Sequence, residues 1–472
     1  MKRLLALASL LLLAASPAKL TERQRAQHAL NRLAFGARPG DVDRMLLLGV
    51  DAWIEQQLHP ERINDAAVEA RLRQYATLQY SDTEMVGEFY KPLVEMRKAK
   101  KSKEELDGDP AMRELRQKAR RVSAELVSQR ILRAADSERQ LNEVLVDFWM
   151  NHFNVYAAKG VDRFLLTSYE RDVIRPHIWG RFDDLVLATA KSPAMLFYLD
   201  NARSRDGAIN ENYARELMEL HTLGVDGGYT QKDVTELARV LTGWSIRRPQ
   251  EGDAGFVFRR FVHDRGAKEV LGQKIAAGGG MEEGERMIRF LSRQPATAHH
   301  IALELCQRLV SDDPPPALVA RVAQRFLATK GDLRETVRAV ITSGEFWSPA
   351  AYQTKFKSPF EYAISAVRAV GATVDNPLPL ARELQKIGEP LYLAQPPTGY
   401  SDRSDAWTNS GALMARLNFA VALASNKLPG VRVENVPPLD LDLSPTTRKA
   451  IADKDPVTTA GLILGSPEFQ RQ

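Results

Sequence analysis

Cysteine is almost absent from this chain of 472 residues, which contains a single one, Cys306. An internal disulfide is therefore impossible, and stability has to come from a packed core. The absence of CxxC and CxxCH motifs also excludes cysteine-based zinc sites and covalently attached c-type haem. Cys306 lies in HHIALELCQRLV at helical spacing from apolar neighbours. We therefore interpret it as a buried structural thiol.

Apolar runs long enough to span a membrane are missing after the N-terminus. At the N-terminus, Lys2 and Arg3 precede an apolar run, Leu4–Ala15, and small residues follow at 16–18. The run is too short to cross a bilayer comfortably, and the small residues match a cleavage site. We predict a signal peptide over residues 1–18, export to the periplasm or beyond, and a mature chain without a transmembrane span.

A strong excess of one charge is missing as well. The formal net charge is +5 and falls to +3 once Lys2 and Arg3 are removed, because acidic residues are interspersed with the basic ones. This balance argues against a nucleic-acid partner. The hydrophobic fraction of 44% and the charged fraction of 26% are typical of a soluble globular protein.

Helical periodicity runs through most of the mature chain. We predict one large, mainly α-helical, bundle-like domain over residues 19–472. Alternating aromatic residues predict a small β-ribbon insertion around 245–272. A densely charged segment at about 84–134, with RKAKKSK at 97–103, predicts an exposed helical arm. Acidic residues interleave with the basic ones there, which favours a solvated helix face over a membrane-binding one.

The stretch 210–244 carries the densest run of groups that could do chemistry. Wound as a helix, its first part places Asn212, Glu216 and Glu219 on one polar stripe. Arg215 lies beside this stripe and is four residues from Glu219, so the two can pair.

A glycine-rich turn, GVDGGYT, joins this helix to a second one. Gly224 suits the left-handed residue that ends a helix, and Thr230 with Asp233 predicts a capping box. Val234 and Leu237 then begin a buried face. A well-capped helical hairpin explains the stretch as well as a functional site does, so both interpretations stay open.

A second informative segment, RQLNEVLVDFWMNHFNVY at 139–156, predicts a helix with His152 in the middle of its apolar face. A buried imidazole must find a hydrogen-bond partner or it costs roughly 1–3 kcal/mol. Another segment has to supply that partner. A core histidine tied to a carbonyl remains open beside a metal ligand or a general base.

Two further histidines complete the candidates. His263 and Asp264 are adjacent in a loop after the predicted ribbon, and His221 falls at the edge of an apolar stripe. The candidate catalytic residues are His152, Asn212, Arg215, Glu216, His263 and Asp264. The candidate metal ligands are His152, His221 and His263, although they lack the compact spacing of most metal sites. The residues do not identify a cofactor.

Several motifs, in order along most of the mature chain, carry a family resemblance. They are LNRLAFGARPGDVD, DFWMNHFNV, NENYARELMELHTLGVDGGYTQKDVTELARVLTGW, FVHDRGAKEVLG, KSPFEY and PPTGYSDRSDAWTNSGALMARLNFA. With them the chain resembles the bacterial family called domain of unknown function 1800. The resemblance implies an exported protein with a helical fold. It also implies a sulfatase-like exported partner, and it implies no established activity.

These observations leave two functions open. The first is an exported envelope binding or assembly factor that uses the charged arm to hold its sulfatase-like partner or a polysaccharide. The alternative is an exported hydrolase or metal-dependent enzyme. That alternative would require His152, Glu216 and the pair His263-Asp264 to gather in one cleft.

Overall fold

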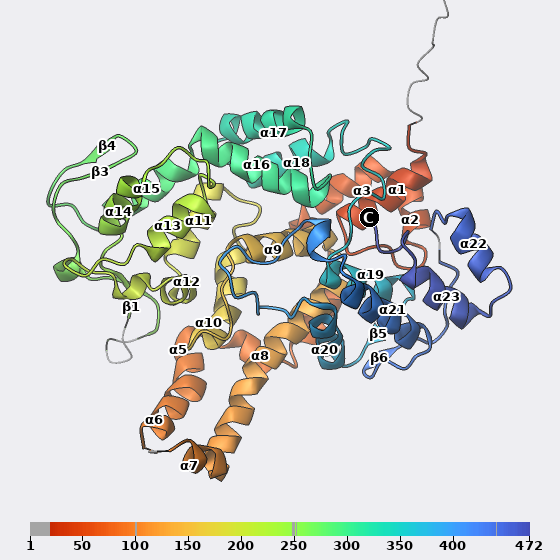
Figure 1. The fold of residues 1–472 in the computed structure, drawn as a ribbon, viewed down its shortest axis with the longest axis horizontal. Coiled ribbons are helices and arrows are strands. Elements are labelled where there is room, and N and C mark those ends of the chain that lie inside the picture. Colours follow the sequence, from red (N-terminus) through yellow and green to blue (C-terminus); the bar gives the residue numbers. More distant parts are fainter. Residues whose placement is uncertain (1–18, 100–101, 248–250, 252, 440) are drawn as a thin grey trace, which may run out of the picture.

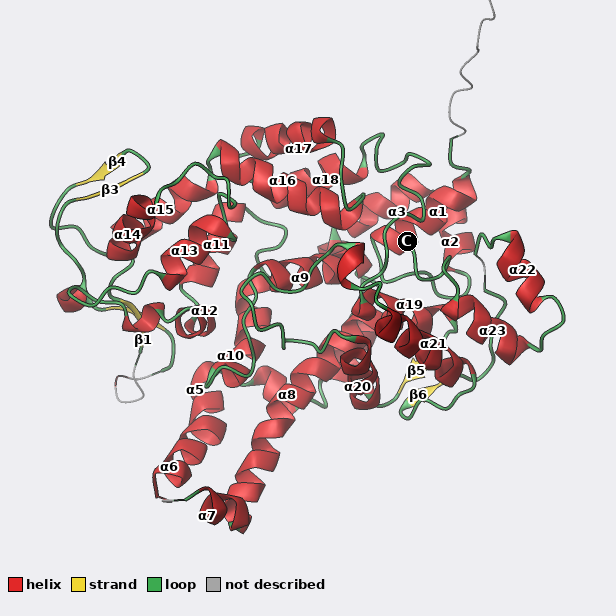
Figure 2. Cartoon of the chain, in the orientation of Figure 1, coloured by secondary structure: helices red, strands yellow, loops and turns green. Residues whose placement is uncertain are grey.

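The fold is mainly α-helical, as predicted, with only short β-ribbons (Figures 1 and 2). The computed structural model describes residues 19–99, 102–247, 251, 253–439 and 441–472. The predicted signal peptide at 1–18 lies outside the described residues. Within them, no helix is both long enough and apolar enough to cross a membrane.

The N-terminal helices pack against one another on one side of the molecule (Figure 1). They are α1 (Glu22–Arg32), α2 (Asp41–Leu48) and α3 (Val50–Gln57). The next helix, α4 (Ala66–Leu72), packs instead on the long helix Pro110–Asp136. Thr21 begins α1 with a capping box, in which its hydroxyl accepts from the Gln24 N–H and the Gln24 side chain accepts from the Thr21 N–H. Leu33 and Phe35, which follow the last residue of α1, are both buried in the core.

The charged segment is helical and forms an arm that projects from the body (Figures 1 and 2). It comprises α5 (Asp82–Met85), α6 (Lys91–Ala99), α7 (Lys103–Gly108) and the long α8 (Pro110–Asp136). A narrow apolar seam holds the hairpin together, because Leu93 and Met112 are buried while most of its charged residues are exposed. The last turns of α8 enter the body, where Ile131 and Leu132 are fully buried. The freely projecting part is therefore shorter than the segment 84–134.

Helix α9 (Gln140–His152) lies near the middle of the molecule (Figure 1). It is buried on nearly every side, including Trp149 at 0% exposure. It contacts α3 and α8 directly. Among the helices that follow it along the chain are α10 (Asp162–Ser168), α11 (Phe182–Ala190), α12 (Pro193–Tyr198), α16 (Pro295–Leu309), α17 (Pro316–Ala328) and α18 (Leu333–Ile341). A helix buried all round must satisfy its polar side chains inside the protein.

The central stretch forms a capped helical hairpin, α13 (Asn212–Glu219) and α14 (Gln231–Val240). Gly224 adopts φ +83°, and Thr230 and Asp233 form the predicted capping box. Val234 and Leu237 are fully buried, as expected. The predicted pairing of Arg215 with Glu219 is wrong, because Arg215 instead turns back to Glu211 at 3.2 Å and to Gln231 at 2.8 Å.

The predicted β-ribbon is present as two short antiparallel ribbons. The first pairs β1 (Trp244–Ile246) with β2 (Phe256–Phe258), and the second pairs β3 (Lys268–Val270) with β4 (Gln273–Ile275). Leu271 and Gly272 form the two-residue loop of the second ribbon, both with positive φ, which is the geometry that suits the twist of a tight hairpin. Beside the ribbons, α15 (Met281–Ser292) packs on Trp244 through Gly284.

The C-terminal helices return to the N-terminal ones (Figure 1). They are α19 (Pro359–Ala369), α20 (Pro377–Ile387), α21 (Ser410–Ala424), α22 (Pro445–Ile451) and α23 (Pro456–Gly465), with a third ribbon of β5 (Thr373–Val374) and β6 (Val431–Arg432). Arg368 of α19 joins the two regions, since its buried guanidinium donates to the carbonyls of Gly36 at 2.9 Å and Ala135 at 2.8 Å.

The contact between α15 and Trp244 yields a stability prediction. A Cβ at position 284 would lie 2.5 Å from the Trp244 ring, so Gly284→Ala should overpack this core and lower the free energy of unfolding by about 1–3 kcal/mol. Urea unfolding of the purified protein measures this change. Gly411→Ala is the matched control, because the nearest atom to its new Cβ is 3.5 Å away and an alanine suits a helix. Equal stability of the two variants would contradict the packing argument.

Candidate functional site

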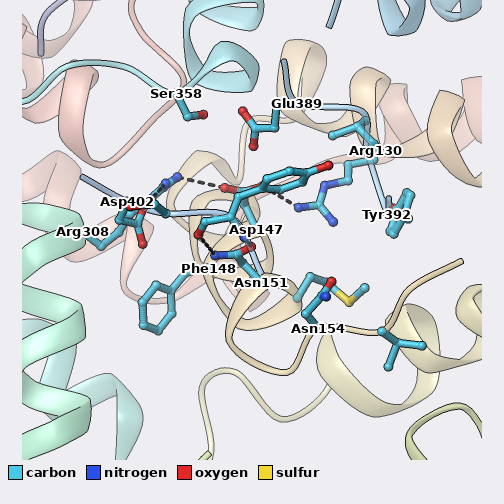
Figure 3. A pocket seen from close by; sticks show the side chains of 15 residues that line it. Arg130, Asp147, Phe148, Asn151, Asn154, Arg308, Ser358, Glu389, Tyr392 and Asp402 are labelled. Carbon is cyan, nitrogen blue, oxygen red and sulfur yellow. Dashed lines mark hydrogen bonds and ion pairs between the residues drawn. The ribbon is translucent and has the colours of Figure 1, made fainter. Parts of the chain in front are cut away.

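A polar cavity opens where α8, α9 and α16 meet the irregular segment 388–404 (Figure 3). Its volume is about 40 Å³, which is room for ordered water rather than for a substrate. Charged side chains from distant parts of the chain line it, among them Arg130, Asp147, Arg308, Glu389 and Asp402. We therefore treat this charged cavity as the first candidate site.

Asp147 lies between two guanidinium groups in the charged cavity (Figure 3). Arg130 donates to one carboxylate oxygen at 2.5 Å and Arg308 donates to the other at 2.9 Å. Asp147 and Asn151 are four residues apart, so both project from the same face of α9. An ion pair this deeply buried is stable only when its members keep their partners.

Arg308 bonds three carboxylates at once, although it is only 6% exposed. Besides Asp147, it donates to Asp402 at 2.9 Å and reaches Glu361 at 3.0 Å. These acids come from α9, from the segment 388–404 and from α19. The side chain of Arg308 therefore connects three elements that are far apart in sequence.

Glu389 is the one acid of this group without an ion-pair partner in the described part of the chain. It accepts a hydrogen bond from the backbone N–H of Phe360 at 2.8 Å. Burial, reinforced by the nearby charge of Asp147, raises the pKa of Glu389 to about 8. Its carboxyl group is therefore largely protonated at neutral pH.

The pKa of Glu170, a carboxylate bonded to Tyr392, is shifted in the opposite direction from that of Glu389. Burial alone would raise its pKa, but the guanidiniums of Arg175 and Arg130 and the Tyr392 hydroxyl lower that pKa to about 2. Tyr392 donates to Glu170 at 2.5 Å, and its own backbone has φ +60°. A non-glycine residue in that region is held there by its surroundings.

The segment 388–404 crosses the charged cavity, and side chains at the C-terminal end of α9 form hydrogen bonds with its backbone. Asn151 donates to the Tyr400 carbonyl and accepts from the Tyr400 N–H, both at 2.7 Å. Asn154 donates to the carbonyls of Ala394 and Pro396 at 3.0 and 2.8 Å. Gly399, with φ +68°, lies so close to Asn151 that a Cβ there would meet its amide at 2.3 Å. Side chains of α9 and of the residues just after it thus replace regular secondary structure as partners for this backbone.

His152 is buried and bonded to a distant segment, as its position on the apolar face predicted. Its Nδ1 lies 2.7 Å from Glu304 of α16, and its Nε2 lies 3.4 Å from the His221 carbonyl. His300 is close, with ring centroids 6.2 Å apart. The contact of His152 with Glu304 lies about one helical turn from the contact of Asp147 with Arg308. Two polar contacts therefore connect α9 to α16.

His221 is fully enclosed beside His152. Burial, together with the neighbouring His152 and His300, lowers its pKa well below the usual range. Its Nε2 has no hydrogen-bond partner among the described atoms. No group of three or more His, Cys, Asp or Glu side chains in the described part of the chain has an arrangement that could hold a metal ion.

His263 and Asp264 have a separate set of partners near the ribbons. His263 Nδ1 lies 2.9 Å from the Thr242 carbonyl, and its Nε2 is 3.4 Å from Glu283, which also pairs with Lys268. Asp264 accepts from Arg239 at 2.7 Å. The third candidate metal ligand therefore has different neighbours from His152 and His221.

The side chains of the candidate residues on α13, which are Asn212, Arg215 and Glu216, have partners different from those of the two histidine sites. Asn212 is exposed, and its amide lies 3.4 Å from the Leu199 carbonyl. Glu216 is partly buried, and burial followed by the charge of Glu219 raises its pKa. The six catalytic candidates thus fall into three sets with different partners, rather than into one cleft.

Sequence reasoning did not single out five residues that the structure brings together: Arg130, Glu304, Arg308, Glu389 and Asp402. One available signal was the charged pair Glu304 and Arg308, four residues apart on one helix. Another was Asp147 with Asn151 on a helix rich in large apolar residues. Such pairs predict that two helices meet through charges, but not which helices they are.

We expect the raised pKa of Glu389 to make folding depend on pH. The unfolded chain loses this proton near pH 4.3 and the folded protein near pH 8, so the wild type should lose stability as the pH rises between these values. Glu389→Gln cannot lose a proton. Its unfolding free energy should therefore rise relative to the wild type by a few kcal/mol between pH 5 and pH 9.

Urea unfolding at pH 5, 7 and 9 measures this difference. Glu269→Gln, at an exposed position of β3, is the matched control and should follow the wild type at every pH. Parallel pH profiles for the wild type and Glu389→Gln would show that Glu389 is ionised in the folded protein.

A comparison with protein families finds one match that spans nearly the whole chain. The family is described as "Protein of unknown function (DUF1800)", and its model matches residues 28–471. No curated protein and no solved structure matches the chain.

Proposed function

The chain belongs to the DUF1800 family, and from this premise we propose that it is an exported binding or assembly protein that holds a sulfatase-like partner with its helical arm. Export follows from the N-terminal sequence, with Lys19 as the first mature residue. The partner follows from the family resemblance. The observation that carries the proposal is the arm itself, which leaves the body and exposes its charged side chains.

The charge of the arm supports a partner with an acidic face. Residues 91–121 contain eleven Lys and Arg against six Asp and Glu, whereas the whole chain is nearly balanced. Arg97 and Lys98 are exposed on α6, close to the turn at the far end of the arm. Charge complementarity of this kind accelerates association and selects partners.

The arm is suited to binding because it is already folded. Leu93 and Met112 form its buried seam, and Arg116 pairs across the turn with Asp107 at 2.7 Å. A preformed hairpin loses less conformational freedom on binding than a flexible loop does.

The charged cavity supports the same interpretation. Its arginines and most of its acids are paired with one another, and the free volume is about 40 Å³. A closed network of this kind stabilises one arrangement of helices. In this proposal, the network keeps the body rigid while the arm makes the contact.

The arm should lose its partner when its terminal charge is reversed. We expect the double substitution Arg97→Glu, Lys98→Glu to weaken binding of the co-exported sulfatase-like protein at least tenfold, because two attractions become repulsions. Binding of the purified proteins is measured at 50 and 300 mM salt. The wild-type affinity should fall at the higher salt, since exposed charges are screened.

The chain offers a matched control on another exposed helix. Arg448 and Lys449 are adjacent and exposed on α22, and reversing both changes the net charge by the same amount. That control should bind like the wild type. If both double variants bind equally well, the arm is not the binding element.

Glu389 favours a second candidate function, an exported hydrolase. A carboxyl group that stays protonated near neutral pH, close to the carboxylate of Asp147, resembles the separated acid and base of many hydrolytic sites. A substrate could enter only if the segment 388–404 moved, because the cavity beneath it is too small.

A hydrolase of this kind should depend on the protonated form of Glu389. We expect any turnover of nitrophenyl esters or glycosides to fall as the pH rises through about 8 and to drop at least a hundredfold in Glu389→Gln. Initial rates from pH 5 to pH 10 measure both effects, with Glu269→Gln as the control. Unchanged rates in Glu389→Gln would eliminate this candidate.

A further inference from the structure

A larger cavity lies between the N-terminal helices and the residues Pro437, Pro438, Leu439 and Leu441. Its volume is about 330 Å³, within the range that proteins use for small ligands. Its walls are mainly apolar, formed by Ala37, Pro39, Val42, Ala369, Leu439 and Phe469. This apolar cavity is separate from the charged cavity described above.

One amine lies in the wall of the apolar cavity. Lys357 is 3% exposed, and its Nζ donates to the Phe469 carbonyl at 2.8 Å while lying 4.2 Å from the centre of the Phe469 ring. No carboxylate within the described residues lies within ion-pair distance of this amine. Lys355, which is equally buried, differs in this respect because Asp312 pairs with it at 2.8 Å.

The charges around Lys357 disfavour its protonated form. Glu361 of α19 attracts a proton to the amine, whereas Arg416 of α21 and Arg32 of α1 repel one. Burial is the largest effect, and together these influences lower the pKa of Lys357 to about 7. A large share of the amine is therefore neutral and nucleophilic at neutral pH, as in lysines that form Schiff bases.

Apart from Lys357, the charged groups that line the apolar cavity are already in ion pairs. Arg23 pairs with Asp43 at 3.1 Å, and Arg38 pairs with Glu138 at 2.9 Å. A charged ligand would have to compete with these pairs, while an apolar ligand would bury its surface against the remaining wall. The cavity therefore favours a neutral, largely apolar molecule.

We propose that Lys357 forms an imine with a small apolar aldehyde or ketone bound in this cavity. The lone pair on Nζ attacks the carbonyl carbon, and one proton passes from the nitrogen to the carbonyl oxygen to give a carbinolamine. The nitrogen then loses its second proton as the hydroxyl leaves as water, which forms the C=N bond. The step requires no oxidant or reductant. It does not depend on the binding function of the arm.

Reductive trapping with hexanal and cyanoborohydride on the full-length folded protein tests this proposal. The hydride converts any imine into a stable secondary amine, and peptide mass spectrometry locates it. At pH 7 we expect Lys357 to be labelled at least tenfold faster than Lys355, because an ion-paired ammonium is not nucleophilic. Labelling of Lys357 should reach half its maximum near pH 7.

Two variants separate the site from general lysine reactivity. Lys357→Met should abolish the fast label, and Leu439→Trp should slow it by filling the cavity without altering the amine. The wild-type labelling pattern and the Leu439→Trp result remain decisive if Lys357→Met does not fold. Label spread evenly over exposed lysines, or label on Lys357 that is unaffected by Leu439→Trp, would overturn the proposal.

Discussion

The buried charge of Arg308 is the constraint on which the middle of this protein depends. Removing a guanidinium from water costs several kcal/mol unless carboxylates replace the lost hydration. Asp147, Glu361 and Asp402 supply that replacement from three separate elements. The guanidinium therefore has its full set of partners only when all three elements are in place. The burial of one side chain in this way couples α9, α19 and the crossing segment.

The same coupling explains how an irregular segment can lie inside a helical protein. Residues 388–404 have no sheet or helix ladder to satisfy most of their backbone, so polar side chains must do it. Asn151 of α9 and Asn154, two residues after its end, fill this role, and Asp402 secures the far end through Arg308. Polar residues on or just after a helix that is buried on nearly every side are therefore partners for a distant backbone, and a high local density of polar groups does not by itself indicate catalysis.

Local features of the fold could be predicted from the sequence, while the charged cavity could not. The capping boxes at Thr21 and Thr230, the arm and the ribbons depend on residues a few positions apart, where periodicity and propensity are informative. The contact of Asp147 with Arg308 spans 161 residues, and that of Asn151 with Tyr400 spans 249. Local patterns contain no information about such pairings. The wrong pairing of Arg215 shows the same limit at short range, because both partners lie four residues away and the α13–α14 packing decides between them.

The contact of Arg368 with the carbonyls of Gly36 and Ala135 has a consequence for how the chain folds. Its acceptors lie 332 and 233 residues earlier in the sequence. During synthesis, the N-terminal helices therefore cannot complete their native packing until the last quarter of the chain has left the ribosome. Closing a loop of this length costs chain entropy before the contact stabilises the fold. Until Arg368 has been synthesised, the carbonyls of Gly36 and Ala135 lack this native donor, so this part of the N-terminal half stays incomplete while most of the chain is being made.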